Sequence, residues 1–172
     1  MKKQATLFLV TGGARSGKSL LAERLVSRIG SPAIYIATAE RRDAEMTQRI
    51  EIHRERRGSG WSTIEEPYDL AEALSASDGR GVRLVDCLTL WLANMEGKED
   101  VTALCDTLRV QKSPVVLVTN ELGQGIVPDN ALARRFRDSH GWMNQAVADI
   151  ADEVWMAVSG QPLRLKPQEH PL

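Results

Sequence analysis

Cysteine is scarce in this chain of 172 residues, which contains only Cys87 and Cys105. These two form no C-x-x-C pair, and none of the three histidines has a partner at a metal-ligand spacing. The pattern argues against a disulfide framework and against a structural zinc site. It favours a protein that remains reduced, and we therefore expect a cytoplasmic location.

An excess of charge of one sign is also missing. Lysine and arginine together number 22, against 23 aspartates and glutamates, which gives a formal net charge of −1. A chain with so little net charge has no overall field to attract a nucleic acid or a membrane surface. We expect no nucleic-acid partner, and any anion site must be local.

Long hydrophobic runs are absent as well. No segment approaches the roughly 18 consecutive apolar residues of a membrane-spanning helix. The opening stretch MKKQATLFLVTGG carries two lysines and a short apolar run, but it leads into a glycine loop without a convincing cleavage site. We interpret it as a first strand, so any membrane contact would be peripheral and made through a partner.

What the sequence does contain is an alternation of short apolar runs and segments with helical spacing. At this length, with no repeat and no low-complexity linker, we expect one domain over residues 1–172. The predicted strands are Thr6–Thr11, Ala33–Thr38, Val82–Asp86, Pro114–Thr119 and Glu153–Val158, with a short last strand at LRLK. The predicted helices are Ser19–Ile29, Asp43–Arg56, Asp69–Leu74, Leu88–Asn94, Val101–Val110 and Asn130–Ile150. This order predicts an α/β fold with a mostly parallel sheet and helices on both faces.

The stretch TGGARSGKS after the first strand fits the phosphate-binding pattern G-x-x-x-x-G-K-[ST]. Glycines let successive backbone N–H groups turn toward phosphate oxygens, and the following helix adds its positive N-terminal end. We expect Lys18 to reach the outer phosphates and Ser19 to ligate Mg²⁺. The residues expected to bind nucleotide here are Gly12, Gly13, Ala14, Arg15, Ser16, Gly17, Lys18 and Ser19.

A phosphate loop needs a carboxylate at the end of another strand to hold the metal. Asp86, which ends the strand in VRLVDCLTLW, is the candidate. It could also cap the helix that begins near Leu88. A switch GTPase is disfavoured, because TNEL and DCLT match neither its base-reading element nor its D-x-x-G loop.

The segment from residue 37 to 67 places His53 among several arginines. On spacing alone, a packed or solvated histidine on a charged helix face is the simpler interpretation. A neutral imidazole beside cations is nevertheless a plausible nucleophile for phosphorus.

Polar side chains also follow the Pro114–Thr119 strand directly. Asn120 and Glu121 lie where parallel sheets place ligands, and could hold metal, phosphate or an acceptor. His140 falls on one apolar stripe of the long helix, which predicts a packed residue or a subunit contact rather than a catalytic one. Ser159 and Gly160 fit equally a contact to the base and a plain turn.

Several blocks, in order along nearly the whole chain, resemble the bifunctional adenosylcobinamide kinase / adenosylcobinamide-phosphate guanylyltransferase family of cobalamin biosynthesis. They are LVTGGARSGKS, YIATAE, RI-x-x-H-R-x-x-R-x-x-x-W with EEP after it, LVDCLTLWLANM, VVLVTNELGQGIVPDNALARRFRD and ADEVWMAVSG. The resemblance implies a P-loop fold of the RecA-like type. It also implies a homotrimer, for which Trp142 is a candidate contact, and contact with membrane-bound enzymes of the pathway.

The resemblance assigns His53 as the residue that becomes guanylylated, and so replaces the packed interpretation. It implies GTP and ATP as substrates, Mg²⁺ as the metal, and adenosylcobinamide and its phosphate as acceptors. The residues it adds to the nucleotide site are Arg49, Arg54, Arg57, Glu66 and Asp86. No residue identifies itself as the base for the acceptor hydroxyl; Glu121 and Asp86 are the two candidates.

Two other functions stay open on the sequence. A simple P-loop small-molecule kinase would form no covalent nucleotide and would not need His53. A non-catalytic nucleotide-binding module would need Lys18 and show no turnover.

Overall fold

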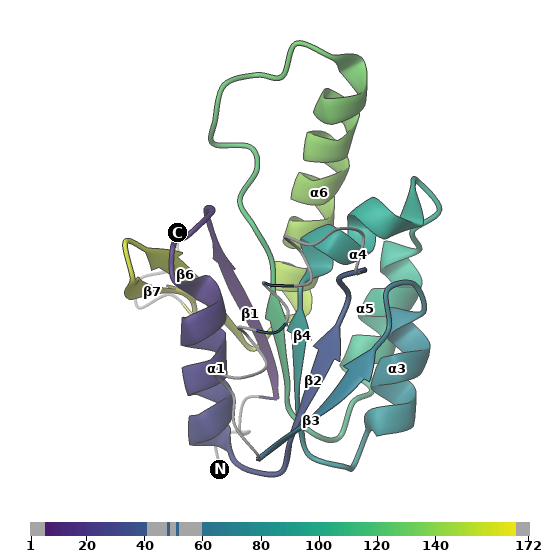
Figure 1. The fold of residues 1–172 in the computed structure, drawn as a ribbon, viewed down its shortest axis with the longest axis vertical. Helices are drawn as coiled ribbons and strands as arrows, with labels where there is room; N and C mark the ends of the chain where they lie inside the picture. Colours follow the sequence, from purple (N-terminus) through teal and green to yellow (C-terminus); the bar gives the residue numbers. More distant parts are fainter. Residues whose placement is uncertain (1–5, 41–47, 49–50, 52–59, 168–172) are drawn as a thin grey trace.

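The protein is described from a computed structural model, in which residues 6–40, 48, 51 and 60–167 are placed (Figure 1). Within these residues the sheet has seven strands in the order β3-β2-β4-β5-β1-β6-β7. All neighbours pair in parallel except β7, which pairs antiparallel with β6. The strands are β1 (Leu7–Gly12), β2 (Ala33–Ala37), β3 (Trp61–Glu65), β4 (Val82–Asp86), β5 (Val115–Val118), β6 (Glu153–Val158) and β7 (Gln161–Lys166).

Helices cover both faces of this sheet. Figure 1 shows α1 on one side and the other labelled helices on the opposite side, with α6 projecting beyond the sheet. The helices are α1 (Lys18–Ile29), α3 (Leu70–Ser77), α4 (Leu88–Met95), α5 (Val101–Arg109) and α6 (Ala131–Ile150). The predicted P-loop α/β architecture, a mostly parallel sheet with helices on both faces, is confirmed.

The core consists of two apolar layers, one on each face, because successive residues of a strand point to opposite sides. Phe8 and Val10 of β1 pack with Val26 of α1 in one layer. Leu7 and Leu9 belong to the other layer, under the remaining helices. Strands buried on both faces explain why the sequence shows continuous apolar runs rather than alternation.

Some elements differ from the prediction. Strand β3 was not predicted, and α3 continues to Ser77 instead of ending at Leu74. The helix predicted from Asn130 begins at Ala131, and Asn130 is its N-cap, whose side chain accepts from the Ala133 N–H. The helix predicted at Asp43–Arg56 falls almost entirely outside the described residues.

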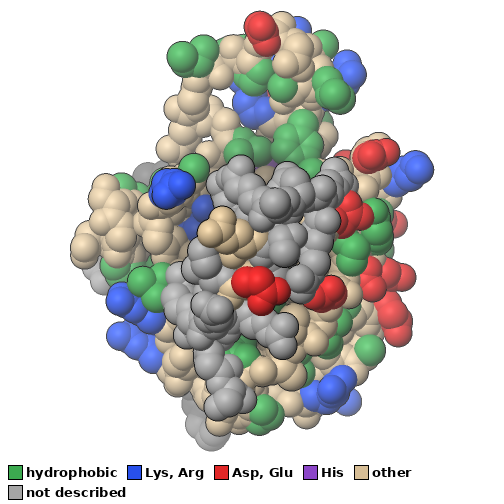
Figure 2. All heavy atoms as spheres, in the orientation of Figure 1, with side chains coloured by type: hydrophobic (Ala, Val, Ile, Leu, Met, Phe, Trp, Pro, Cys, Tyr) green, Lys and Arg blue, Asp and Glu red, His purple; other side chains and the backbone are tan. Residues whose placement is uncertain are grey.

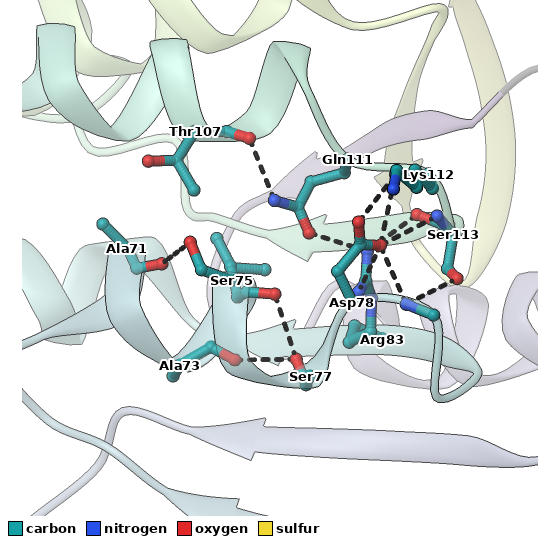
Figure 3. A network of polar contacts seen from close by, with 12 residues as sticks. Ala71, Ala73, Ser75, Ser77, Asp78, Arg83, Thr107, Gln111, Lys112 and Ser113 are labelled. Carbon is teal, nitrogen blue, oxygen red and sulfur yellow. Dashed lines mark hydrogen bonds and ion pairs between the residues drawn. The ribbon is translucent and has the colours of Figure 1, made fainter.

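At the amino edge of the sheet, a buried ion pair ties two loops together (Figure 3). The fully buried guanidinium of Arg83 donates to Asp78 Oδ1 at 3.0 Å and to the Ser113 carbonyl at 2.7 Å. The Asp78 carboxylate also accepts the N–H groups of Lys112 and Ser113 at 3.0–3.1 Å. Partial burial raises the pKa of Asp78, but these N–H groups and Arg83 outweigh it, so that the pKa lies below its ordinary value.

The carboxyl ends of the parallel strands meet at the opposite edge. Parallel α/β sheets bind their ligands at this edge. The predicted site residues Lys18, Asp86 and Glu121 all follow or end strands here. No helix among the described residues is long and apolar enough to cross a membrane.

Candidate functional site

The phosphate loop joins β1 to α1 and is held by close backbone packing. Gly17 has φ 93°, and a Cβ there would lie 3.2 Å from Gly160 Cα. A Cβ on Gly12 would approach the Ala157 carbonyl oxygen to 2.7 Å. The Gly160 N–H donates to the Ser16 carbonyl at 2.9 Å. The turn after β6 therefore supports the loop, and Ser159 and Gly160 form this turn, with φ 51° and 78°.

The loop presents groups that suit an anion. Helix α1 begins without a side-chain cap and without an acidic residue in its first turn, so no carboxylate competes for its N-terminal N–H groups. The Lys18 ammonium donates to the Gly13 carbonyl at 3.1 Å, and the buried Ser16 hydroxyl has no partner. A cationic side chain, free N–H groups and an unpaired hydroxyl are the features of a phosphate site.

Asp86 ends β4 on the side of the sheet that α1 covers. The Tyr35 hydroxyl donates to Asp86 Oδ2 at 3.2 Å. The backbone of the next residue, Cys87, is held by two hydrogen bonds with the Thr38 side chain. The Thr38 hydroxyl accepts from the Cys87 N–H at 2.8 Å and donates to the Cys87 carbonyl at 2.7 Å. Cys87 itself is the N-cap of α4, so Asp86 does not cap that helix.

The charges of Asp86 and Lys18 both act on the buried thiol of Cys87. Burial and the negative charge of Asp86 raise the pKa of Cys87 to about 12, while the positive charge of Lys18 acts in the opposite direction. Both charges are thus close enough to be felt at the same buried atom. This thiol is protonated at neutral pH and is not a nucleophile.

The donor set fits a hard cation only if phosphate and water complete it. The predicted ligands Ser19 and Asp86 carry oxygen donors of the kind that Mg²⁺ prefers, but they are too few for a protein-only site. Correspondingly, the described ranges contain no group of three or more His, Cys, Asp or Glu side chains that could hold a metal ion. This composition is typical of sites where magnesium arrives with a nucleotide.

Glu121 lies directly against the phosphate loop. Its Oε1 accepts a hydrogen bond from the Thr11 hydroxyl at 2.7 Å, and its N–H donates to the Gly12 carbonyl at 3.2 Å. Strand β5, which precedes it, is hydrogen-bonded to β1 throughout. Glu121 therefore lies beside the phosphate loop at the carboxyl edge of the sheet, and its catalytic role stays a prediction.

His140 of α6 is buried, at 1 % exposure, where α6, α4 and β5 meet. Its Nε2 lies 2.9 Å from Thr89 Oγ1 and 3.3 Å from Thr119 Oγ1. Burial lowers the pKa of His140, and the negative charge of Glu121 offsets part of that shift. The prediction of a packed rather than catalytic histidine agrees with this position.

The remaining predicted site residues contribute no contact to the phosphate loop among the described residues. His53, Arg49, Arg54 and Arg57 lie outside the described residues. Glu66 is described, and its Oε1 accepts the N–H groups of Tyr68 and Asp69 at 2.9 and 2.8 Å, just before α3. This carboxylate therefore shapes the turn into α3.

The sequence reasoning missed the hydroxyls that support the site. Thr11, Thr38 and Thr89 hold Glu121, Cys87 and Asn120 respectively. The sequence did indicate where such hydroxyls could lie, because a threonine ends or follows the apolar run at β1, β2 and β5. Thr89 carried no such signal, since its partners are far away in the chain.

On the face seen in Figure 2, lysine and arginine gather beside α1, and acidic side chains gather on the α3–α5 side. Apolar side chains are exposed on the projecting part formed by α6 and the loop before it. The most exposed of these are Ile126, Val127, Leu132 and Trp142, at 97, 63, 71 and 68 %.

Comparison with known proteins adds to this geometry. Residues 8–165 match the family model for cobinamide kinase / cobinamide phosphate guanyltransferase. The bifunctional adenosylcobalamin biosynthesis protein CobP of Pseudomonas aeruginosa is 45 % identical over 168 residues, 92 % of this chain and 96 % of that protein. The bifunctional adenosylcobalamin biosynthesis protein CobU of Escherichia coli is 41 % identical over 181 residues, 93 % of this chain and 99 % of that protein.

A solved structure from Pyrococcus horikoshii OT3 matches with a TM-score of 0.51 and 9 % identity. The match covers 92 % of this chain and 85 % of that one. At this identity the likeness concerns the fold alone, and it agrees with the α/β architecture described above.

Proposed function

The chain belongs to the cobinamide kinase / cobinamide phosphate guanyltransferase family, and from this premise we propose how one site carries out both reactions. The activity is that of a bifunctional enzyme of adenosylcobalamin biosynthesis, which uses nucleoside triphosphates. The observation that carries the proposal is the phosphate loop, with Lys18 and free N–H groups at the start of α1, beside the Glu121 carboxylate.

In the first reaction, the aminopropanol hydroxyl of adenosylcobinamide attacks the γ-phosphorus of ATP or GTP. The bond to the β–γ bridging oxygen breaks, and a nucleoside diphosphate leaves. The phosphate loop would hold the β and γ phosphates, and Lys18 would neutralise the charge that develops on them. Alignment of hydroxyl and phosphate supplies much of the acceleration in such transfers.

The hydroxyl proton needs an acceptor in this step. We assign the role of proton acceptor to Glu121 in preference to Asp86. The Glu121 carboxylate is held against the phosphate loop by Thr11. A base there would lie near the phosphates held by the loop, and proximity is the first requirement for proton transfer.

In the second reaction, a nitrogen of His53 attacks the α-phosphorus of GTP, and pyrophosphate leaves. A phosphate oxygen of adenosylcobinamide phosphate then attacks the phosphoramidate, the P–N bond breaks, and adenosylcobinamide-GDP forms. Two successive displacements let one nucleophile serve a bulky acceptor. The support for His53 is the R-I-x-x-H-R block, with Arg49, Arg54 and Arg57 as the cations that would balance the phosphates.

Magnesium is part of the proposal, with the Ser19 hydroxyl and the Asp86 carboxylate as its protein ligands. When bound, it would neutralise charge on the nucleotide phosphates. Tyr35 donates a hydrogen bond to Asp86, and Thr38 fixes the backbone of the adjoining Cys87, so these contacts would keep Asp86 in position.

We also propose a homotrimer in the cytoplasm. The exposed Ile126, Val127, Leu132 and Trp142 support an interface on the α6 side. Cys87 and Cys105 are free and buried, which suits a reducing compartment.

The test is product analysis with purified protein, Mg²⁺, GTP and adenosylcobinamide, followed by mass spectrometry. We expect adenosylcobinamide phosphate first and adenosylcobinamide-GDP afterwards, with both products abolished in Lys18→Ala. The phosphate alone would leave a simple kinase as the function, and nucleotide binding without either product would leave a binding module.

A further inference from the structure

The strand end that carries Asn120 and Glu121 is fixed by residues from two helices. Thr89 Oγ1, on α4, accepts hydrogen bonds from both the Asn120 N–H and the Asn120 side-chain amide, each at 3.1 Å. Asn144, on α6, donates its side-chain N–H to the Asn120 carbonyl at 2.9 Å. The backbone of Asn120 is therefore held at both its donor and its acceptor.

The donors and acceptors in this network determine the protonation state and the tautomer of His140. Thr89 Oγ1 uses its two acceptor positions for Asn120, so its own proton points to His140 Nε2, 2.9 Å away. Thr119 Oγ1 gives its proton to Asn144 Oδ1 at 2.8 Å and so offers none to the histidine. Nε2 must then accept, which leaves the imidazole neutral with its proton on Nδ1.

We propose that His140, Thr89 and Asn144 are positioning residues for phosphoryl transfer. They fix Asn120 and thereby hold the adjoining Glu121 carboxylate against Thr11 of the phosphate loop. The inference rests on the proposed function, in which Glu121 accepts the proton of the acceptor hydroxyl. It adds a role to three residues of α4 and α6, which lie outside the phosphate loop.

The electrostatics of the site agree with a neutral histidine. Burial is the main cause of the lowered pKa of His140. The negative charge of Glu121 acts in the opposite direction and raises this pKa in part. The groups facing the imidazole from α4 and β5 are the hydroxyls of Thr89 and Thr119, and its own helix contributes Phe136, with ring centroids 6.2 Å apart. Protonation at Nε2 would remove the acceptor for the Thr89 proton and loosen the hold on Asn120.

The kinetic test uses Thr89→Val, which removes the hydroxyl at nearly constant volume, and Thr89→Ser, which keeps it. Thr6→Val is the matched control, because it deletes a hydroxyl that bonds Asp152 at the opposite edge of the sheet. Because misalignment acts on the chemical step, we expect Thr89→Val to lower kcat for phosphoryl transfer about tenfold or more. The KM for nucleotide should stay within about twofold.

The second readout separates positioning from general damage. Covalent labelling by α-labelled GTP does not use Glu121 in the proposed mechanism, so its extent should be unchanged in Thr89→Val. Thr89→Ser and Thr6→Val should match the wild-type kcat. Unchanged kcat in Thr89→Val, or equal loss of phosphoryl transfer and covalent label, would overturn the inference.

A spectroscopic measurement judges the network without any activity. The ¹⁵N NMR signals of the histidine rings, assigned with His140→Asn, should show His140 protonated at Nδ1 and unprotonated at Nε2 at pH 7. A proton on Nε2 would refute the network even in an active enzyme. Failure of the wild type to form either product would instead refute the proposed function, while the NMR result would still decide on the network.

Discussion

At the scale of single residues, the site depends on a few positions where a side-chain atom is either excluded or indispensable. The spacing of Gly12, Gly17 and Lys18 was sufficient to predict a phosphate loop, because the backbone geometry of that loop admits few residue types. The hydrogen bond from Thr11 to Glu121 could not be predicted, since its residues are 110 positions apart in the chain. Only the packing of β5 beside β1 brings them together.

Gly17→Ala is expected to disable the phosphate loop. The new Cβ would lie 3.2 Å from Gly160 Cα, at a backbone φ of 93° that side chains rarely adopt. We expect nucleotide affinity to fall about fivefold or more, since strain of this kind costs roughly 1–3 kcal/mol. Titration with a fluorescent GTP analogue measures this loss of nucleotide affinity.

Gly125→Ala is the matched control for this change. A Cβ at Gly125 would meet no atom within 4 Å, and we expect affinity like that of the wild type. Equal affinity of Gly17→Ala and wild type would show that the turn after β6 does not constrain the loop.

At the scale of elements, the buried strands and their helices were predicted from apolar runs, and β3 was missed. Its sequence, WSTIE, is half exposed and polar because it pairs with β2 on one side only. This segment lacks the continuous apolar run that marked the central strands. The network around His140 was also beyond prediction, because Thr89 and His140 are 51 positions apart and meet only when α4 and α6 pack together.

Asp78→Asn is expected to destabilise the amino edge of the sheet. The change leaves the guanidinium of Arg83, which is fully buried, without its counter-charge. Removal of one partner of a buried pair costs roughly 3–5 kcal/mol. Urea unfolding at pH 7 measures the loss, with Asp106→Asn as control, because the Asp106–Arg109 pair is exposed and should contribute less than about 1 kcal/mol.

The same pair has a defined pH dependence. Because the pKa of Asp78 is lowered by folding, its contribution is fully present above the ordinary value of 3.8 and is lost as pH falls through the folded value. The difference in unfolding free energy between wild type and Asp78→Asn should therefore be constant from pH 7 to about pH 5 and shrink below 3.8. A difference that grows on acidification would contradict this assignment.

At the scale of the whole molecule, the exposed apolar residues of α6 and its preceding loop predict assembly. Ile126 is 97 % exposed in the single chain. If this patch forms the proposed trimer interface, Ile126→Glu should shift the sedimentation coefficient from that of a trimer to that of a monomer, because a charge would be buried.

Val110→Glu is the control for this assembly test, since Val110 is 72 % exposed at the end of α5. It should leave the sedimentation coefficient unchanged. A wild-type protein that sediments as a monomer at assay concentration would exclude the trimer.

In the proposed mechanism one phosphate loop serves two displacements, with His53 as the nucleophile of the second. The most direct test incubates the protein with Mg²⁺ and GTP labelled separately at the α and γ positions, then denatures it and follows the retained label. We expect α label only, stable to alkali and labile to acid, and absent from His53→Asn. A wild-type protein that binds GTP but retains no covalent α label would contradict the account and leave a simple kinase.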